Sequence, residues 1–200
     1  SDPELSMALS ESVLAGLIAP TGDGRSGYRF THALIGRVAA EKRAEPDAHR
    51  LHRDIAEAVE EFYPDDPDEH LDEIAHHYLA GELESDPRET ARYCWRAGER
   101  AYERHAFEEA HEYFLNGLER RRPYPHDQLT AGLLRGLGRS QLQTMEFHES
   151  AIAVESLTSA FDLFLELGDT VQALETASIY VNALPGVSLS TELISRAIEL

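Results

Sequence analysis

The chain has almost no cysteine. Cys94 is the only one among 200 residues, so no disulfide can form within the chain, and we expect a reducing, cytoplasmic location. Cys94 also falls at the spacing of apolar residues. This register predicts a small buried side chain and not a nucleophile, because free cysteine is among the most buried residue types.

Long apolar runs are also missing. The longest one near the start, residues 13–19, is too short to span a bilayer and has no basic segment before it. We therefore expect neither a signal peptide nor a membrane helix. The chain begins without Met and stops inside a helical pattern, so we expect it to be a segment of a longer protein.

Basic residues are scarce, with 18 Lys and Arg against 37 Asp and Glu, a net charge of −19. Such a surface repels phosphate backbones and anionic lipids, so we predict no direct nucleic-acid partner and no membrane partner. Lys42 is the only lysine. A GC-rich genome would explain that bias, and adaptation to high salt would explain both the bias and the acidity. The apolar content of 42% argues against disorder.

Small residues recur 40 positions apart. They are Gly98, Gly138 and Ser178, and apolar residues recur at the same offset. A long period of this kind is typical of stacked helix pairs, which bury their apolar faces only against their neighbours. The apolar sets are Cys94, Leu134 and Leu174; Phe107, Phe147 and Val187; and Ala91, Ala131 and Val171.

The predicted fold is all-α, a right-handed solenoid of tandem antiparallel helix pairs over residues 45–200. Residues 1–44 form a separate unit, in which a helix, a hairpin around a glycine-rich turn and a second helix at 32–43 are typical of a partial winged helix. Apolar spacing, prolines and glycines predict helices at residues 4–19, 46–62, 67–80, 85–104, 106–121, 126–144, 148–166, 169–183 and from about 190. In the helix at 46–62, the predicted apolar face consists of Leu51, Ile55, Ala58, Val59 and Phe62.

Residues 91–123 resemble a tetratricopeptide repeat. The resemblance rests on the small residue Gly98, on aromatic and alanine positions in both helices, and on Pro123 after the second helix. It implies close helix packing by Gly98, Ala101, Phe107, Ala110 and Phe114, with Gly138 and Phe147 in the next copy.

The same resemblance implies that the first helix of each pair lines a concave groove for a protein or peptide. In this chain the groove positions are Arg92, Trp95, Glu99 and Tyr102. An aromatic pair among charged groups suits a peptide or a partner helix. The other interpretation is that Trp95 packs against the preceding helix pair.

Four segments in order resemble the region that follows the ATPase core of STAND-type signalling ATPases, such as large LuxR-type transcription regulators. They are residues 28–35, 51–56, 74–78 and 96–101. The resemblance implies an ATPase domain upstream that binds ATP or ADP and contacts this segment. The segment itself would have no cofactor and no enzymatic activity.

The expected function is therefore a regulatory, protein-interaction segment of an ATP-dependent transcription regulator. The alternative is a scaffold segment of an ATPase linked to a kinase or an adenylyl cyclase. By resemblance, His32 occupies the position of a histidine that contacts bound ADP in the full-length protein. The plainer interpretation of His32 is a local hydrogen bond at a helix start.

Ten histidines raise the question of a metal-dependent hydrolase, the third and least favoured function. His70, Glu73 and His77 share a helix face, and His49 and His52 share another, but no CxxC motif accompanies them. We therefore assign no metal site and no catalytic residue.

Two further patterns have structural explanations. The spacing of the glycines at 22, 24 and 27 matches the dinucleotide-binding motif GxGxxG. These glycines, however, join two strand-like segments, which favours a hairpin turn. Arg120 to Arg122, joined by Arg135 and Arg139, form the main basic cluster. This cluster suits either a helix C-terminus or an acidic partner.

Overall fold

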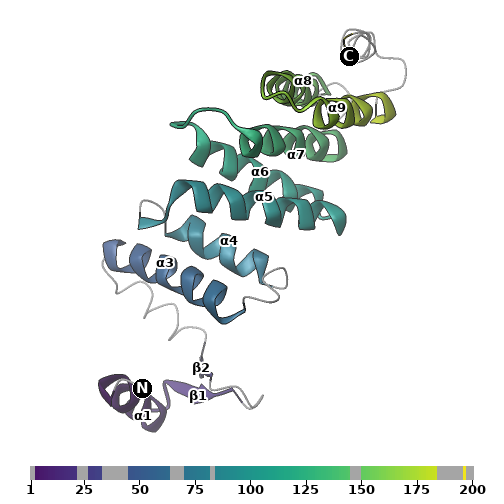
Figure 1. Ribbon diagram of the computed structural model, residues 1–200. Helices are drawn as coiled ribbons and strands as arrows, with labels where there is room; N and C mark the ends of the chain where they lie inside the picture. The colour runs from purple at the N-terminus through teal and green to yellow at the C-terminus, as the bar shows by residue number, and fades with distance from the viewer. Residues whose placement is uncertain are drawn as a thin grey trace. The chain divides into compact units, whose positions relative to one another are not determined.

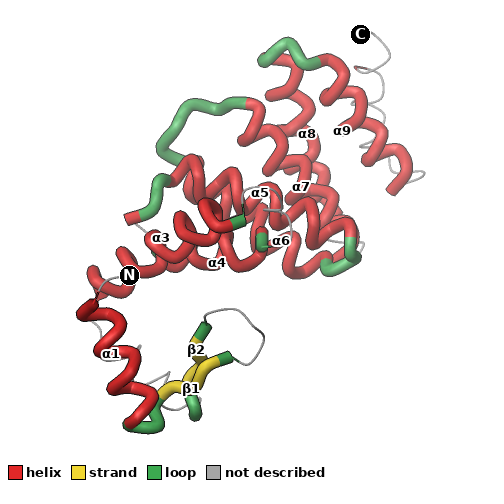
Figure 2. The backbone as a smooth tube through the Cα atoms, turned by 60° about the horizontal axis from the view of Figure 1, so that its bottom comes forward, coloured by secondary structure: helices red, strands yellow, loops and turns green. Residues whose placement is uncertain are grey.

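The computed structural model describes residues 3–21, 27–32, 45–63, 70–81, 84–144, 150–183 and 196. These residues form α-helices and one small antiparallel sheet, which confirms the all-α class (Figures 1 and 2). The chain divides into two compact units between Ala48 and His49, and each unit is described by itself.

The first unit begins with helix α1 (Pro3–Leu14), which is shorter than predicted. It ends early because Gly16 adopts a left-handed backbone with φ of 68°, which glycine reaches without steric cost. The Leu17 amide then donates to the Ser12 carbonyl at 3.0 Å, which closes the helix end in the manner of a Schellman motif.

The predicted hairpin is confirmed. Strand β1 (Ile18–Pro20) pairs antiparallel with β2 (Tyr28–Phe30), with Ile18 opposite Phe30. The helix predicted at 32–43 lies outside the described residues except for His32.

The second unit is a succession of helices. Each helix from α4 to α9 packs against the next one along the chain, and α7 also contacts both α5 and α9 (Figure 1). The bounds agree with the sequence prediction to within a few residues. They are α3 (Glu45–Phe62), α4 (Leu71–Ala80), α5 (Pro87–Glu103), α6 (Phe107–Arg121), α7 (Gln128–Thr144), α8 (Ser150–Glu166) and α9 (Thr170–Ala183).

Local signals place these helix ends. Asp86 caps α5, because its carboxylate accepts a hydrogen bond from the Arg88 amide at 2.8 Å, and Pro87 fits the first helical position. Helices α5 and α6 are joined by a three-residue turn in which His105 has a φ of 65°. Helix α8 ends before Gly168, whose φ of 78° suits a glycine cap.

Glycines bring α5, α6 and α7 into close contact. The Phe114 ring of α6 is fully buried between Gly98 of α5 and Gly136 of α7. A Cβ on Gly98 would lie 2.6 Å from Phe114 Cε1, so only glycine leaves room for the ring. One turn along α6, Gly117 lies against Cys94 and Leu133, so α6 runs antiparallel to both neighbours.

The predicted packing register holds for the first two copies of the repeat. Gly98 and Gly138 each lie against the helix that follows, since a Cβ on Gly138 would lie 2.7 Å from Leu157 Cγ. Ala101 and Ala110 are buried, while Phe107 is partly buried and its ring contacts Tyr102 and His105. Phe147 and Val187 lie outside the described residues.

Two expectations about apolar faces are wrong. At the third copy, Ser178, Val171 and Leu174 on α9 are exposed. On α3, Leu51 and Phe62 are exposed and the buried residue is Ala56. Val59 still packs against the core cluster that contains Leu71 and Ile74 of α4, and His52 and Glu60 also contact α4.

Candidate functional site: a pocket lined by α5, α7 and α9

A pocket of about 520 Å³ lies where α5, α7 and α9 meet, with one wall from α8. It contains two of the four predicted groove residues, Arg92 and Trp95. Its apolar lining includes Trp95, Leu129 and Phe164, and its rim is polar. The lining residues are Arg92, Trp95, Gln128, Leu129, Gly132, Arg135, Phe164, Asp169 and Gln172.

Trp95 contacts the next helix pair. Its indole lies against Gly132 of α7, where a Cβ would be 3.1 Å from Nε1. The indole N–H is buried and has no hydrogen-bond partner among the described residues. An unsatisfied buried donor is costly, and Gly132 rather than a polar group lies beside this N–H.

The other two predicted groove residues, Glu99 and Tyr102, are already engaged by α7. The Arg139 guanidinium lies 2.6 Å from Glu99 Oε1 and stacks 4.1 Å from the centroid of the Tyr102 ring. Both charged side chains are mostly buried, at 17% and 28% exposure. Arg139 therefore occupies this half of the α5 face, whereas Arg92 and Trp95 line the pocket.

Arg135 holds the floor of the pocket. Its Nη1 donates to Gln172 Oε1 at 2.5 Å and lies 3.5 Å from Glu175, while its guanidinium lies 5.4 Å from the Phe164 ring centroid. Burial lowers the pKa of Arg135 below its usual value, because few contacts replace the water it has lost. The side chain is still cationic and is only 15% exposed.

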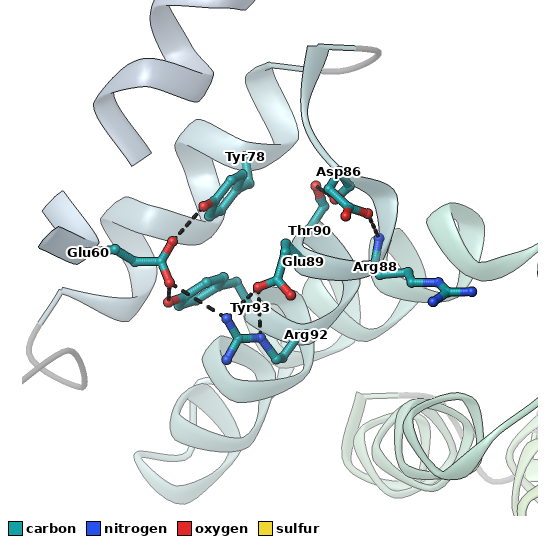
Figure 3. A network of polar contacts seen from close by, with 8 residues as sticks. All are labelled: Glu60, Tyr78, Asp86, Arg88, Glu89, Thr90, Arg92 and Tyr93. Atoms are coloured by element: carbon teal, nitrogen blue, oxygen red, sulfur yellow. Dashed lines mark hydrogen bonds and ion pairs between the residues drawn. The ribbon is translucent and has the colours of Figure 1, made fainter. Parts of the chain in front are cut away.

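A carboxylate network supports the edge of the pocket (Figure 3). Glu60 of α3 accepts a hydrogen bond from the Tyr78 hydroxyl of α4 at 2.5 Å and another from the Tyr93 hydroxyl of α5. Arg92 lies 3.6 Å from the same carboxylate and also pairs with Glu89. One acidic side chain thus ties three helices together and holds Arg92 at the pocket rim.

The predicted basic cluster is divided between two faces, which corrects the expectation of a single patch. Arg121 is buried and pairs with Asp127 at 2.7 Å, and Arg120 donates to the Leu79 carbonyl at 3.4 Å. Arg135 and Arg139 lie instead on the face of α7 that meets α5 and α9. Arg120 and Arg121 therefore serve to join helices.

Most of the pocket residues were not predicted from the sequence, although the 40-residue period relates several of them. Gly132 and Gln172 lie 40 and 80 residues after Arg92, and Arg135 lies 40 residues after Trp95. These residues line the same pocket because equivalent positions on successive first helices face the same side of the stack. Phe164 belongs to the second helix of a pair, so a 40-residue offset from Arg92 or Trp95 does not predict it.

The remaining candidates lie apart from the pocket. His32 is exposed directly after β2. Cys94 is fully buried, and burial raises the pKa of its thiol to about 12, so it is no nucleophile at neutral pH.

The histidines are arranged differently from the sequence pattern. His70 contacts Glu73 at 3.3 Å, but His77 turns to His52 of α3, with the two Nδ1 atoms 2.8 Å apart. Burial, followed by the nearness of His52 and His76, lowers the pKa of His77, so its ring is neutral at pH 7. Among the described residues, no group of three or more metal-ligating side chains is arranged around a common centre.

In the part of the chain that the structure describes, no helix combines the length and apolarity needed to cross a bilayer. No family model, no curated protein and no solved structure matches the chain.

Proposed function

We propose that this chain is a regulatory, protein-interaction segment of a larger ATP-dependent signalling protein, a transcription regulator of the STAND type. Its helix pairs would form a right-handed tetratricopeptide-like solenoid, and residues 1–44 a partial winged helix that packs on an upstream ATPase domain. That domain would bind ATP or ADP, with His32 near the nucleotide, and the protein would work in the cytoplasm.

The observation that carries the proposal is the pocket lined by α5, α7 and α9. Equivalent positions on successive first helices, 40 residues apart, supply its walls, as expected for a groove made by repeats. The pocket joins apolar side chains to a few polar groups. This is the composition of a site that takes one anchor side chain of a peptide or helix.

The chemistry of the lining supports a peptide in particular. The Trp95 ring lines the pocket and offers a rigid surface for an apolar anchor. Arg92 is 46% exposed at the rim and so within reach of a partner's polar groups. We expect the segment alone to catalyse no reaction.

The test is a pull-down from the source cells that compares the unmodified chain with Trp95→Ala and Arg92→Ala. The matched control is Leu115→Ala, which removes a side chain that is 51% exposed on α6, a second helix of a pair. Loss of the same protein with both groove variants, and its retention with the control, supports the proposal. Equal recovery with all three variants contradicts it.

The captured protein can then be tested in purified form. Trp95 is the only tryptophan, so its fluorescence reports directly on the pocket. A partner fragment that enters the pocket will shift the emission and saturate at a defined ratio. A partner that binds without any change in Trp95 emission binds elsewhere on the chain.

The nucleotide role of His32 is tested in the full-length protein. His32→Ala should shorten the retention of bound ADP and raise the basal output, because a donor to the phosphate would be lost. Unchanged nucleotide retention and output would remove His32 from the mechanism and leave the groove proposal intact.

A further inference from the structure

A cluster of three histidines lies outside the pocket, between α3 and α4. His52 comes from the middle of α3 and His77 from the last turn of α4, and their Nδ1 atoms are 2.8 Å apart. Both rings are partly buried, and their centroids are 5.0 Å apart. A third imidazole, His76, has its centroid 6.1 Å from that of His52 and 5.3 Å from that of His77.

The short contact limits the protonation of the pair. Two ring nitrogens at this distance form a hydrogen bond only when one carries a proton and the other presents its lone pair. Two imidazolium rings would direct N–H against N–H. At least one of the two histidines is therefore neutral, and in two neutral rings the Nδ1 lone pairs would face each other across the contact.

We propose that His52 and His77 bind one divalent transition-metal ion through their Nδ1 atoms, with Zn²⁺ as the representative ion. Imidazole nitrogen is a preferred ligand of Zn²⁺, Ni²⁺ and Cu²⁺, whereas Mg²⁺ prefers oxygen. The site has two protein ligands in the described residues, and water completes the coordination.

The two rings have to rearrange to bind the ion. With Zn–N bonds of about 2.0–2.1 Å and tetrahedral angles, two ligating nitrogens are about 3.3 Å apart, and both lone pairs converge on the ion. In the structure the Nδ1 atoms are 2.8 Å apart and the centroids 5.0 Å apart, so the rings meet nearly end to end. Binding therefore requires the Nδ1 atoms to separate by about 0.5 Å and both partly buried rings to rotate by about 20° or more.

Binding needs no redox partner and no change in the net charge of the rings. The ring that carries its proton on Nδ1 moves that proton to Nε2 through solvent, and both Nδ1 lone pairs then bind the ion. The ion replaces one hydrogen bond between α3 and α4 with two coordinate bonds. Bound metal should therefore stabilise the packing of α3 on α4.

The direct test is a calorimetric titration of ZnCl₂ into the full 200-residue chain, without a histidine tag and after treatment with a chelator, at pH 7.5. We expect one ion per chain and no heat with MgCl₂. His52→Gln and His77→Gln should each weaken Zn²⁺ binding at least tenfold. The control variants His70→Gln and His105→Gln, which change histidines outside the pair, should bind as the unmodified chain does.

Loss of folding in a variant is checked by its circular dichroism, and a second readout on the unmodified chain does not depend on variants. With ¹⁵N-labelled histidine, Zn²⁺ should shift the Nδ1 signals of two histidines and leave both rings protonated on Nε2. Zn²⁺ affinity that is equal in the His52 and His77 variants and the controls would overturn the proposal. The absence of any heat or Nδ1 shift up to millimolar Zn²⁺ would overturn it as well.

Discussion

The contact between Phe114 and its two flanking glycines offers the most direct test of the packing. Gly98→Ala would place a methyl group 2.6 Å from Phe114 Cε1, well inside the usual carbon–carbon contact distance of about 3.5–4.0 Å. The ring cannot move away, because Gly136 of α7 lies against its other side.

Two opposing effects set the size of the change. Overpacking of a dense core costs about 1–3 kcal/mol, whereas alanine favours a helix over glycine by about 0.8–1 kcal/mol. We therefore expect Gly98→Ala to lower the free energy of unfolding by up to about 2 kcal/mol. Gly98→Leu, which adds a much larger side chain at the same point, should be more destabilising.

The assay is urea denaturation followed by circular dichroism and by the fluorescence of Trp95. A double-mutant cycle with Phe114→Leu identifies the cause. The smaller side chain leaves room for the new methyl group, so the two substitutions together should cost about 0.5–3 kcal/mol less than the sum of their separate costs. Additive effects, or full stability of Gly98→Leu, would refute the reasoning that the ring is confined between the two helices.

Two further predictions concern titrating groups. At pH 8, iodoacetamide should modify Cys94 only as fast as the protein unfolds, because the thiol is fully buried with a pKa near 12; rapid labelling of the native chain would contradict this. Burial, followed by the hydrogen bond to Glu60, raises the pKa of Tyr93 to about 12. The stabilisation that protonated Tyr93 gives the folded state is therefore complete below about pH 10 and is lost as the pH rises from about 10 to 12. Tyr93 should account for about 2 kcal/mol of the fall in the free energy of unfolding across that interval, so the fall should be smaller by about that amount in Tyr93→Phe; parallel curves would show that Tyr93 is not responsible.

The number of helices in the second unit and their limits were largely predictable, because the signals are local. Asp86 and Pro87 start α5 by their own chemistry, and Gly168 ends α8 by its backbone freedom. The 40-residue period also marked Gly98 and Gly138 as points of close packing, since a glycine in the middle of a helix is costly without a neighbour that needs the space.

The rotation of each helix about its axis was not predictable, and it determines which side chains meet. On α3 the apolar spacing favoured Leu51 and Phe62 as part of the buried face, but both are exposed, while Ala56 and Val59 pack in the core. His52 and Glu60 form hydrogen bonds to residues of other helices, and the sequence near α3 does not reveal those partners.

The sequence by itself thus determined the helical class, the helix ends and the repeat that aligns Arg92 with Gly132 and Gln172. Only the tertiary structure decided that Arg139 closes half of the predicted groove and that His52 meets His77. The physical reason is that capping and periodicity act within a few residues, whereas contacts between charged or ring side chains on different helices depend on how those helices are rotated and offset.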